Sequence, residues 1–168
     1  MYYLAYGSNL NLKEMKYRCP FSKVVGTMYL YNYKLSFKGG ENGFLTIEPK
    51  EGSIVPIGIF KINKLSIKNL DRYEGYPYLY DKKEIEFELN GKKVKGLIYI
   101  MNDELDYGLP SHYYFKRCEV GYNDFNFDKS YLYEALNYTA NSIKSKEMTR
   151  NLHLWQFFDK KWLHLLKK

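Results

Sequence analysis

Strand-like segments fill the first two-thirds of this sequence, and helix-like segments fill the last third. The early segments are rich in Tyr, Val, Ile and Leu, and turns rich in glycine and asparagine separate them. From residue 125 onward the pattern changes, and two stretches with aromatic faces, 129–144 and 152–168, have helical spacing. No regular alternation of strand and helix is present, which argues against a doubly wound parallel sheet. The order of the segments therefore predicts an α+β or closed-sheet architecture.

Turn residues delimit the expected strands. Strands are expected over 2–6, over 24–38 with a bend near Asn32, over 44–48, and over 54–62. Two more strands form a hairpin around Asn90-Gly91, a pair typical of a type I′ turn, with alternating apolar residues on both sides. These segments together supply the strands of the expected α+β or closed-sheet architecture.

Capping residues delimit the expected helices. The helix over 12–18 ends at Pro20, and the helix over 63–73 stops at Gly75. Within the second helix, Leu65, Leu70 and Tyr73 should share one face. A third helix should begin at Pro110-Ser111 and run to about Val120, with Gly121 closing it.

Composition and charge suit an ordinary globular protein. The chain has 168 residues, 45% of them hydrophobic, which suits one packed domain, alone or with an appendage. The net charge is +7, but the lysines are scattered as on a solvated surface, so nucleic-acid binding is the weakest candidate function. No apolar run is long enough for a bilayer and no signal-like segment precedes Tyr3, so we expect a cytoplasmic protein without a membrane role.

The residues that usually hold metals or act as nucleophiles form no motif. Cys19 and Cys118 lie far apart without a Cys-x-x-Cys pair, so neither a disulfide framework nor a thiolate metal site is expected. Cys19 is interpreted as a buried structural thiol because no base accompanies it. His112, His153 and His164 lack the spacing of a zinc motif, and no phosphate-binding glycine loop or nucleophile elbow is present.

The first candidate site is the opening segment, which reads Tyr3-Leu4-Ala5-Tyr6-Gly7-Ser8-Asn9-Leu10. A short strand breaks at a glycine and gives way to a helix signal, in which Asn11 is the expected N-cap and Glu14 its capping-box partner. Such a junction directs several backbone N–H groups and the positive end of a helix dipole at one point. It is therefore either an anion-binding loop or an ordinary structural turn.

The second candidate site is the carboxylate of Glu74. It lies at the predicted end of a helix, and aromatic residues surround it in the sequence, namely Tyr73, Tyr76, Tyr78 and Tyr80. The helix C-terminus and aromatic cover both disfavour the charged form, so the pKa of Glu74 should rise toward the range useful for a general base. Taken singly, a surface glutamate would be the simpler interpretation.

Three motifs in order resemble the γ-glutamylcyclotransferase-like superfamily over about residues 1–125. The first is Tyr-x-x-Tyr-Gly-Ser-Asn-Leu at the start, followed by Met15 and Arg18-Cys19-Pro20. The second is Leu70-Asp71 with Glu74-Gly75 and then Tyr80 before a strand. The third comprises Pro110-Ser111, Tyr114 and Gly121-Tyr122, and Gly26 and Leu35-Ser36-Phe37 also fall at matching places.

The resemblance implies a mixed β-barrel flanked by helices, with one cavity. It implies a cyclotransferase that releases 5-oxoproline from a γ-glutamyl amino acid or γ-glutamyl amine, without a cofactor. Glu74 would be the catalytic acid/base, and the γ-glutamyl group would be held by the opening loop and two tyrosines. The substrate-binding residues implied are Tyr6, Gly7, Ser8, Asn9, Leu10, Tyr80 and Tyr114.

Alternatives concern the leaving group and the C-terminus. The same fold could serve γ-glutamylamine cyclotransfer or removal of γ-glutamyl protecting groups, or the chain could be a non-catalytic small-molecule-binding or interaction protein. Residues 126–168 form a predicted helical extension beyond the domain of residues 1–125. Its last helix carries Trp155 and Trp162 beside Lys160 and Lys161. We expect this extension to pack on the same domain or across a homodimer.

Overall fold

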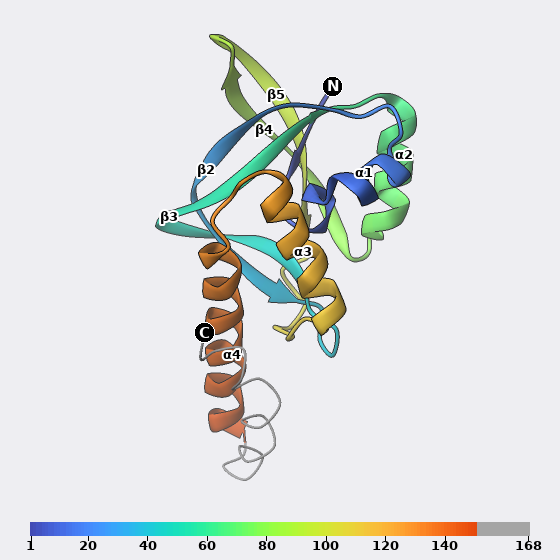
Figure 1. Cartoon of the computed structure of the whole chain (residues 1–168). Coiled ribbons are helices and arrows are strands. Elements are labelled where there is room, and N and C mark those ends of the chain that lie inside the picture. The colour runs from blue at the N-terminus through green and yellow to red at the C-terminus, as the bar shows by residue number, and fades with distance from the viewer. Residues whose placement is uncertain (151–168) are drawn as a thin grey trace.

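A computed structural model of the chain describes the backbone of residues 1–150 and the side chains of residues 1–146 (Figure 1). The strands are β1 (Tyr2–Ala5), β2 (Lys23–Lys38), β3 (Phe44–Lys61), β4 (Tyr80–Leu89) and β5 (Lys92–Met101). The helices are a 3-10 turn η1 (Ser8–Leu10), α1 (Leu12–Arg18), α2 (Lys64–Glu74), α3 (His112–Asp124) and α4 (Ser130–Arg150). This α+β composition is as expected from the sequence.

The strands form one mixed sheet in the order β2-β3-β1-β5-β4. The short strand β1 is central, antiparallel to β3 and parallel to β5, and its residues from Tyr3 to Ala5 are buried. The described strands leave the sheet open, with β2 and β4 as its edges, so the expected barrel is not confirmed. The edges approach one another through side chains, because a Cβ on Gly26 of β2 would lie 3.7 Å from Leu89 Cδ1 of β4.

Two strands expected separately are one long strand, β3. It pairs antiparallel with β2 from Lys61 to Phe44, and both strands bend together where the register shifts between Tyr31 and Tyr33. At the bend Asn32 has a φ of 61° and Gly52 a φ of 74°, and the Asn32 side chain accepts a hydrogen bond from the Gly52 N–H at 3.1 Å. The break expected between residues 48 and 54 is therefore a bulged bend within β3 rather than a strand end. The bend predicted near Asn32 is confirmed.

The hairpin and the second helix have the boundaries that their turn residues predict. Asn90 and Gly91 have φ values of 52° and 74°, as a type I′ turn between β4 and β5 requires. The Asn63 side chain caps α2 by accepting the Ser66 N–H at 2.8 Å, and Gly75 ends it with a φ of 65°.

The predicted buried face of α2 and the predicted end of α3 are partly wrong. Leu70 is buried in α2, but Leu65 is 56% exposed, and Ser66 takes the buried position one turn before Leu70. Gly121 does not close α3 but lies inside it, and a Cβ there would come within 2.6 Å of the Asn11 backbone nitrogen. The glycine is therefore required for close packing of α3 on η1 and not for ending a helix.

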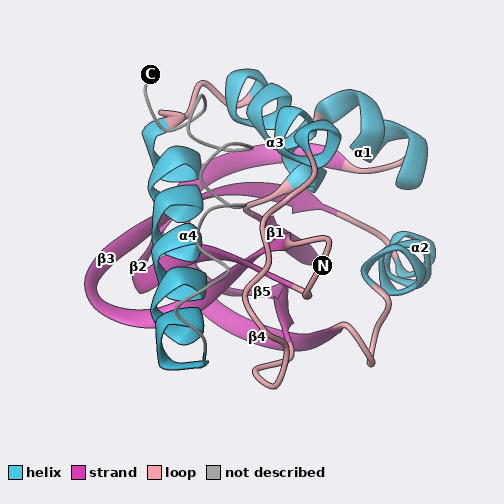
Figure 2. Cartoon of the chain, turned by 90° about the horizontal axis from the view of Figure 1, so that it is seen from below, coloured by secondary structure: helices cyan, strands magenta, loops and turns pink. Residues whose placement is uncertain are grey.

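Helix α4 lies along β2 (Figure 2). The Thr139 hydroxyl accepts a hydrogen bond from the Phe37 N–H at 2.9 Å, and Leu132, Ala135 and Leu136 are buried in the core. The helix is longer than the predicted 129–144, and the second helix expected at 152–168 lies outside the described residues. No helix within residues 1–150 has the length and apolar character needed to cross a membrane.

Candidate active site

The opening loop joins β1 to α1 through the 3-10 turn η1. The Tyr6 hydroxyl donates to the Tyr99 carbonyl of β5 at 2.6 Å, which anchors the loop on the sheet. The Leu10 N–H donates to the Gly7 carbonyl at 2.9 Å, whereas the N–H groups of Gly7, Ser8 and Asn9 belong to the start of the turn, where helical partners are lacking. Three loop N–H groups, and not that of Leu10, are therefore available as donors.

Glu74 is the last residue of α2, and the fold brings it to this loop. The Asn9 side-chain nitrogen donates to Glu74 Oε1 at 2.6 Å, although the two residues are 65 positions apart. Burial raises the pKa of Glu74 from 4.5 to about 7, against the opposing effects of the Asn9 hydrogen bond and the positive charge of Arg18. The predicted direction of this shift agrees with the structure, and burial is its main cause.

Most of the predicted site residues line one cavity, which has a volume of about 20 Å³ for the centres of water-sized occupants. They are Tyr6, Gly7, Ser8, Asn9, Glu74, Tyr80 and Tyr114, and the structure adds Tyr3, Leu45 and Tyr99. Leu10 is not among them, because its side chain is fully buried in the core. This volume is far below that of a typical ligand pocket, so a group of amino-acid size fits only if the lining side chains move.

The aromatic surroundings of Glu74 differ from those predicted. Tyr76 and Tyr78 follow Glu74 in the sequence, but they are 38% and 88% exposed and do not line the cavity. Tyr3 from β1 and Tyr99 from β5 enclose the carboxylate instead. The aromatic cover exists, but strands distant in sequence supply much of it.

Tyr80 and Tyr114 hold the backbone of Leu45 between them. The Tyr80 hydroxyl donates to the Leu45 carbonyl at 2.9 Å, and the Tyr114 hydroxyl accepts the Leu45 N–H at 3.1 Å. Burial raises the pKa of both tyrosines well above their usual range, so both stay neutral. They contribute ring surface to the cavity, while their hydroxyls fix the start of β3.

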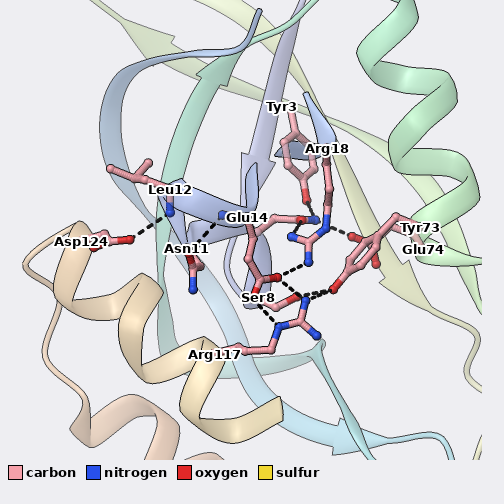
Figure 3. A network of polar contacts seen from close by, with 11 residues as sticks. Tyr3, Ser8, Asn11, Leu12, Glu14, Arg18, Tyr73, Glu74, Arg117 and Asp124 are labelled. Carbon is pink, nitrogen blue, oxygen red and sulfur yellow. Dashed lines mark hydrogen bonds and ion pairs between the residues drawn. The ribbon is translucent and has the colours of Figure 1, made fainter. Parts of the chain in front are cut away.

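The capping prediction at the start of α1 is half correct. The Asn11 side chain accepts the Glu14 N–H at 3.2 Å, so Asn11 is the N-cap. The Glu14 carboxylate does not return to the Asn11 N–H, which donates to the Ser8 carbonyl, but binds Arg18 and Arg117 (Figure 3). Burial opposes ionisation of Glu14, but these two guanidinium groups outweigh it and lower the pKa of Glu14.

The cysteines take no part in the site. Burial raises the pKa of Cys118 to about 12 and also raises the pKa of Cys19, so both thiols stay protonated at neutral pH. Their places in the core agree with the structural interpretation. Across the side chains that the structure describes, no three His, Cys, Asp or Glu residues come together as metal ligands, and His153 and His164 lie outside that part.

Sequence reasoning missed a second set of polar contacts beside the cavity. Arg117 of α3 donates to the Tyr73 hydroxyl at 2.9 Å, and that hydroxyl lies 3.1 Å from Ser8 Oγ. Arg18 belongs to the first of the three family-like motifs, but the sequence assigned it no function. In the structure it donates a hydrogen bond to the Asn9 side chain. The available signal was the position of an arginine one turn after Glu14 on the first helix. Nothing local in the sequence pointed to Arg117.

Comparisons with known proteins bear on the family and the fold of this chain. A protein-family model described as "Gamma-glutamyl cyclotransferase, AIG2-like" matches residues 3–119. A solved structure described as "Gamma-glutamyl cyclotransferase" is 24% identical with a TM-score of 0.68, and the match covers 84% of this chain and 85% of that one.

Two further structures share the fold. The human uncharacterized protein loc79017 is 25% identical with a TM-score of 0.67, over 83% of this chain and 84% of that one. YkqA from Bacillus subtilis is 19% identical with a TM-score of 0.65, over 82% of this chain and 54% of that one. Among curated proteins, no sequence matches. Since the family model spans residues 3–119, the chain belongs to the gamma-glutamyl cyclotransferase, AIG2-like family.

Proposed function

We propose that this protein is a cyclotransferase that releases 5-oxoproline from γ-glutamyl amino acids or γ-glutamyl amines. The observation that carries the proposal is the contact between Asn9 of the opening loop and the Glu74 carboxylate at one cavity. With a pKa of about 7, Glu74 can both take up and release a proton near neutral pH. Family membership supports the same chemistry.

In the proposed reaction the α-amine of the substrate attacks its own γ-carbonyl carbon. A carbon–nitrogen bond forms and closes the five-membered ring of 5-oxoproline, and the carbon–nitrogen bond to the leaving amine breaks. Because both reacting groups belong to one molecule, holding the bent conformer can lower the barrier by on the order of 7–11 kcal/mol.

Glu74 moves the proton in this proposal. The α-amine is an ammonium at neutral pH, so Glu74 takes one proton to free the attacking lone pair and passes it to the leaving nitrogen as the carbon–nitrogen bond breaks. The second proton that the ring nitrogen loses follows the same route, so the amine leaves as an ammonium. The N–H groups of Gly7, Ser8 and Asn9 are donors for the substrate α-carboxylate or for the oxyanion that develops on the attacked carbonyl. Tyr80 and Tyr114 form walls that keep the substrate bent.

The test is product formation from a panel of γ-glutamyl amino acids and γ-glutamyl amines, with 5-oxoproline measured by mass spectrometry. We expect turnover of at least one member, and Glu74→Gln should lower kcat by about 10²–10⁴-fold. Glu41→Gln is the matched control, because Glu41 is an exposed carboxylate outside the cavity. Unchanged turnover in Glu74→Gln would remove Glu74 from the proposal.

The same panel separates the alternatives. A preference for one leaving amine would distinguish amino-acid from amine substrates. Binding of γ-glutamyl compounds without release of 5-oxoproline would favour the non-catalytic small-molecule-binding protein instead.

A further inference from the structure

The side-chain amide of Asn9 lies between a cation and a carboxylate. Arg18 Nη1 donates to Asn9 Oδ1 at 2.8 Å, and Asn9 Nδ2 donates to Glu74 Oε1 at 2.6 Å. The second Asn9 N–H donates to the Tyr3 hydroxyl at 2.8 Å. An arginine has only donors, so its neighbour must be the amide oxygen, and the amide nitrogen must then face Glu74.

We propose that Arg18 is a positioning residue that acts through Asn9 and holds the Asn9 amide nitrogen toward Glu74 in both protonation states of the carboxyl group. This inference rests on the proposed function, and it deepens the assignment of Glu74. Without Arg18, a protonated Glu74 could donate its hydrogen to Asn9 after the amide flipped. With Arg18 present, a flip would place the amide N–H groups against the guanidinium.

The consequence concerns the two oxygens of Glu74. Oε1 always accepts from Asn9, so when the carboxyl group is neutral its proton must sit on Oε2. Oε2 has no hydrogen-bond partner among residues 1–146 and is not a buried unsatisfied atom, so it faces the open space of the cavity. The proton is therefore presented to the cavity and not to the protein.

Arg18 is itself held rigidly. Its guanidinium carbon lies 3.6 Å from the centre of the Tyr73 ring, and Glu14 binds it on the same helix (Figure 3). The Arg18 side chain is 10% exposed, so its contacts are little weakened by solvent. Arg117 also binds Glu14, so the carboxylate that binds Arg18 is held by a second guanidinium group.

Several phenols interact electrostatically with Glu74, and burial keeps them neutral, while the Asp71 carboxylate lies behind one of them and accepts a hydrogen bond from the Tyr99 hydroxyl. Tyr3 comes from β1, Tyr6 from the loop, Tyr80 from β4, Tyr99 from β5 and Tyr114 from α3. Arg18 is the cation that acts on Glu74 in the described part of the chain. Removing Arg18 therefore takes away a positive charge that lowers the pKa of Glu74.

The test follows Glu74 directly by carbon NMR of protein labelled at the glutamate carboxyl groups, with the signal assigned through Glu74→Gln. In Arg18→Gln the titration midpoint of Glu74 should rise by roughly one pH unit, because a nearby cation favours the carboxylate. Lys16→Gln is the matched control, since it removes one positive charge from an exposed position on the same helix. Its midpoint should match that of the unaltered protein.

Kinetics supply a second readout on the same variants. In Arg18→Gln, kcat should fall at least ~10-fold with KM within about 2-fold, and the acid limb of the pH profile should move upward with the NMR midpoint. Added guanidinium ion should restore part of kcat in Arg18→Ala, a result that a merely structural role would not give. An unmoved midpoint in folded Arg18→Gln would overturn the proposal.

One measurement uses the unaltered protein, so the proposal can be tested even if the variants do not fold. The Asn9 side-chain amide protons should titrate with the midpoint of Glu74 and keep one orientation on both sides of it. A change of orientation across that midpoint would overturn the positioning role. If the protein forms no 5-oxoproline but the NMR results are as expected, the proposed function fails while the Arg18–Asn9–Glu74 linkage stands.

Discussion

Glu74 is a carboxylate whose charge changes in the neutral pH range, because burial raises its pKa to about 7. A base must be ionised to accept the substrate proton, so kcat/KM should rise with pH and level off above about 7. Measuring kcat/KM from about pH 5 to 9 checks this, since the profile reports the free enzyme. A profile already level at pH 5 would contradict the assignment of Glu74 as the base.

The same residue should make folding stability depend on pH. The unfolded carboxyl group titrates near 4.5 and the folded one near 7, so the unfolded state loses its proton first as pH rises. Stability should therefore fall between these two values and stay lower above them. Glu74→Gln removes the charge from this half-buried position and should raise the free energy of unfolding at pH 8 by about 2–3 kcal/mol.

Urea denaturation at pH 4 and pH 8 measures this difference. At the lower pH the variant and the unaltered protein should be similar, because Glu74 is then protonated in both the folded and the unfolded state. Glu41→Gln, at an exposed position, should not reproduce the gain at pH 8. A gain of the same size at both pH values would point to a packing effect instead.

Elements pack closely where α3 crosses the turn η1. Gly121→Ala would place a Cβ 2.6 Å from the Asn11 nitrogen and 2.7 Å from Leu10 Cβ. Alanine usually stabilises a helix interior by ~1 kcal/mol over glycine, but here overpacking should reverse the sign and cost about 1–3 kcal/mol. Thermal unfolding measures this loss of stability. Gly26→Ala is the control, because the added Cβ would have no neighbour closer than 3.7 Å.

The elements differ in how well their boundaries follow from local sequence. The ends of α2 depend on the Asn63 cap and on Gly75 with its positive φ, so local rules predict them. The role of Gly121 depends on how closely α3 approaches η1, and the continuity of β3 depends on its pairing with β2. Neither of these is visible in a local sequence window.

At the scale of the whole molecule, the stability of the fold includes the contact between α4 and β2. Thr139→Val keeps the shape of the side chain but leaves the Phe37 N–H without its acceptor in the core. We expect a loss of about 1–3 kcal/mol in unfolding free energy, measured by urea denaturation, and smaller loss in Thr139→Ser. Because neither residue lines the cavity, kcat of the folded protein should not change. A loss of kcat without a loss of stability would contradict this.

Local rules in the sequence alone determined the α+β class, the turn at Asn90-Gly91 and the limits of α2, whereas the family resemblance of the sequence implied the pairing of the loop with Glu74. Only the tertiary structure decided which tyrosines enclose Glu74, that Glu14 binds Arg18 and Arg117, and that the sheet stays open. The physical reason is the range of the interactions. Caps and turns join residues within one turn of the chain, whereas the contact between Asn9 and Glu74 spans 65 positions and forms only when α2 packs beside the loop.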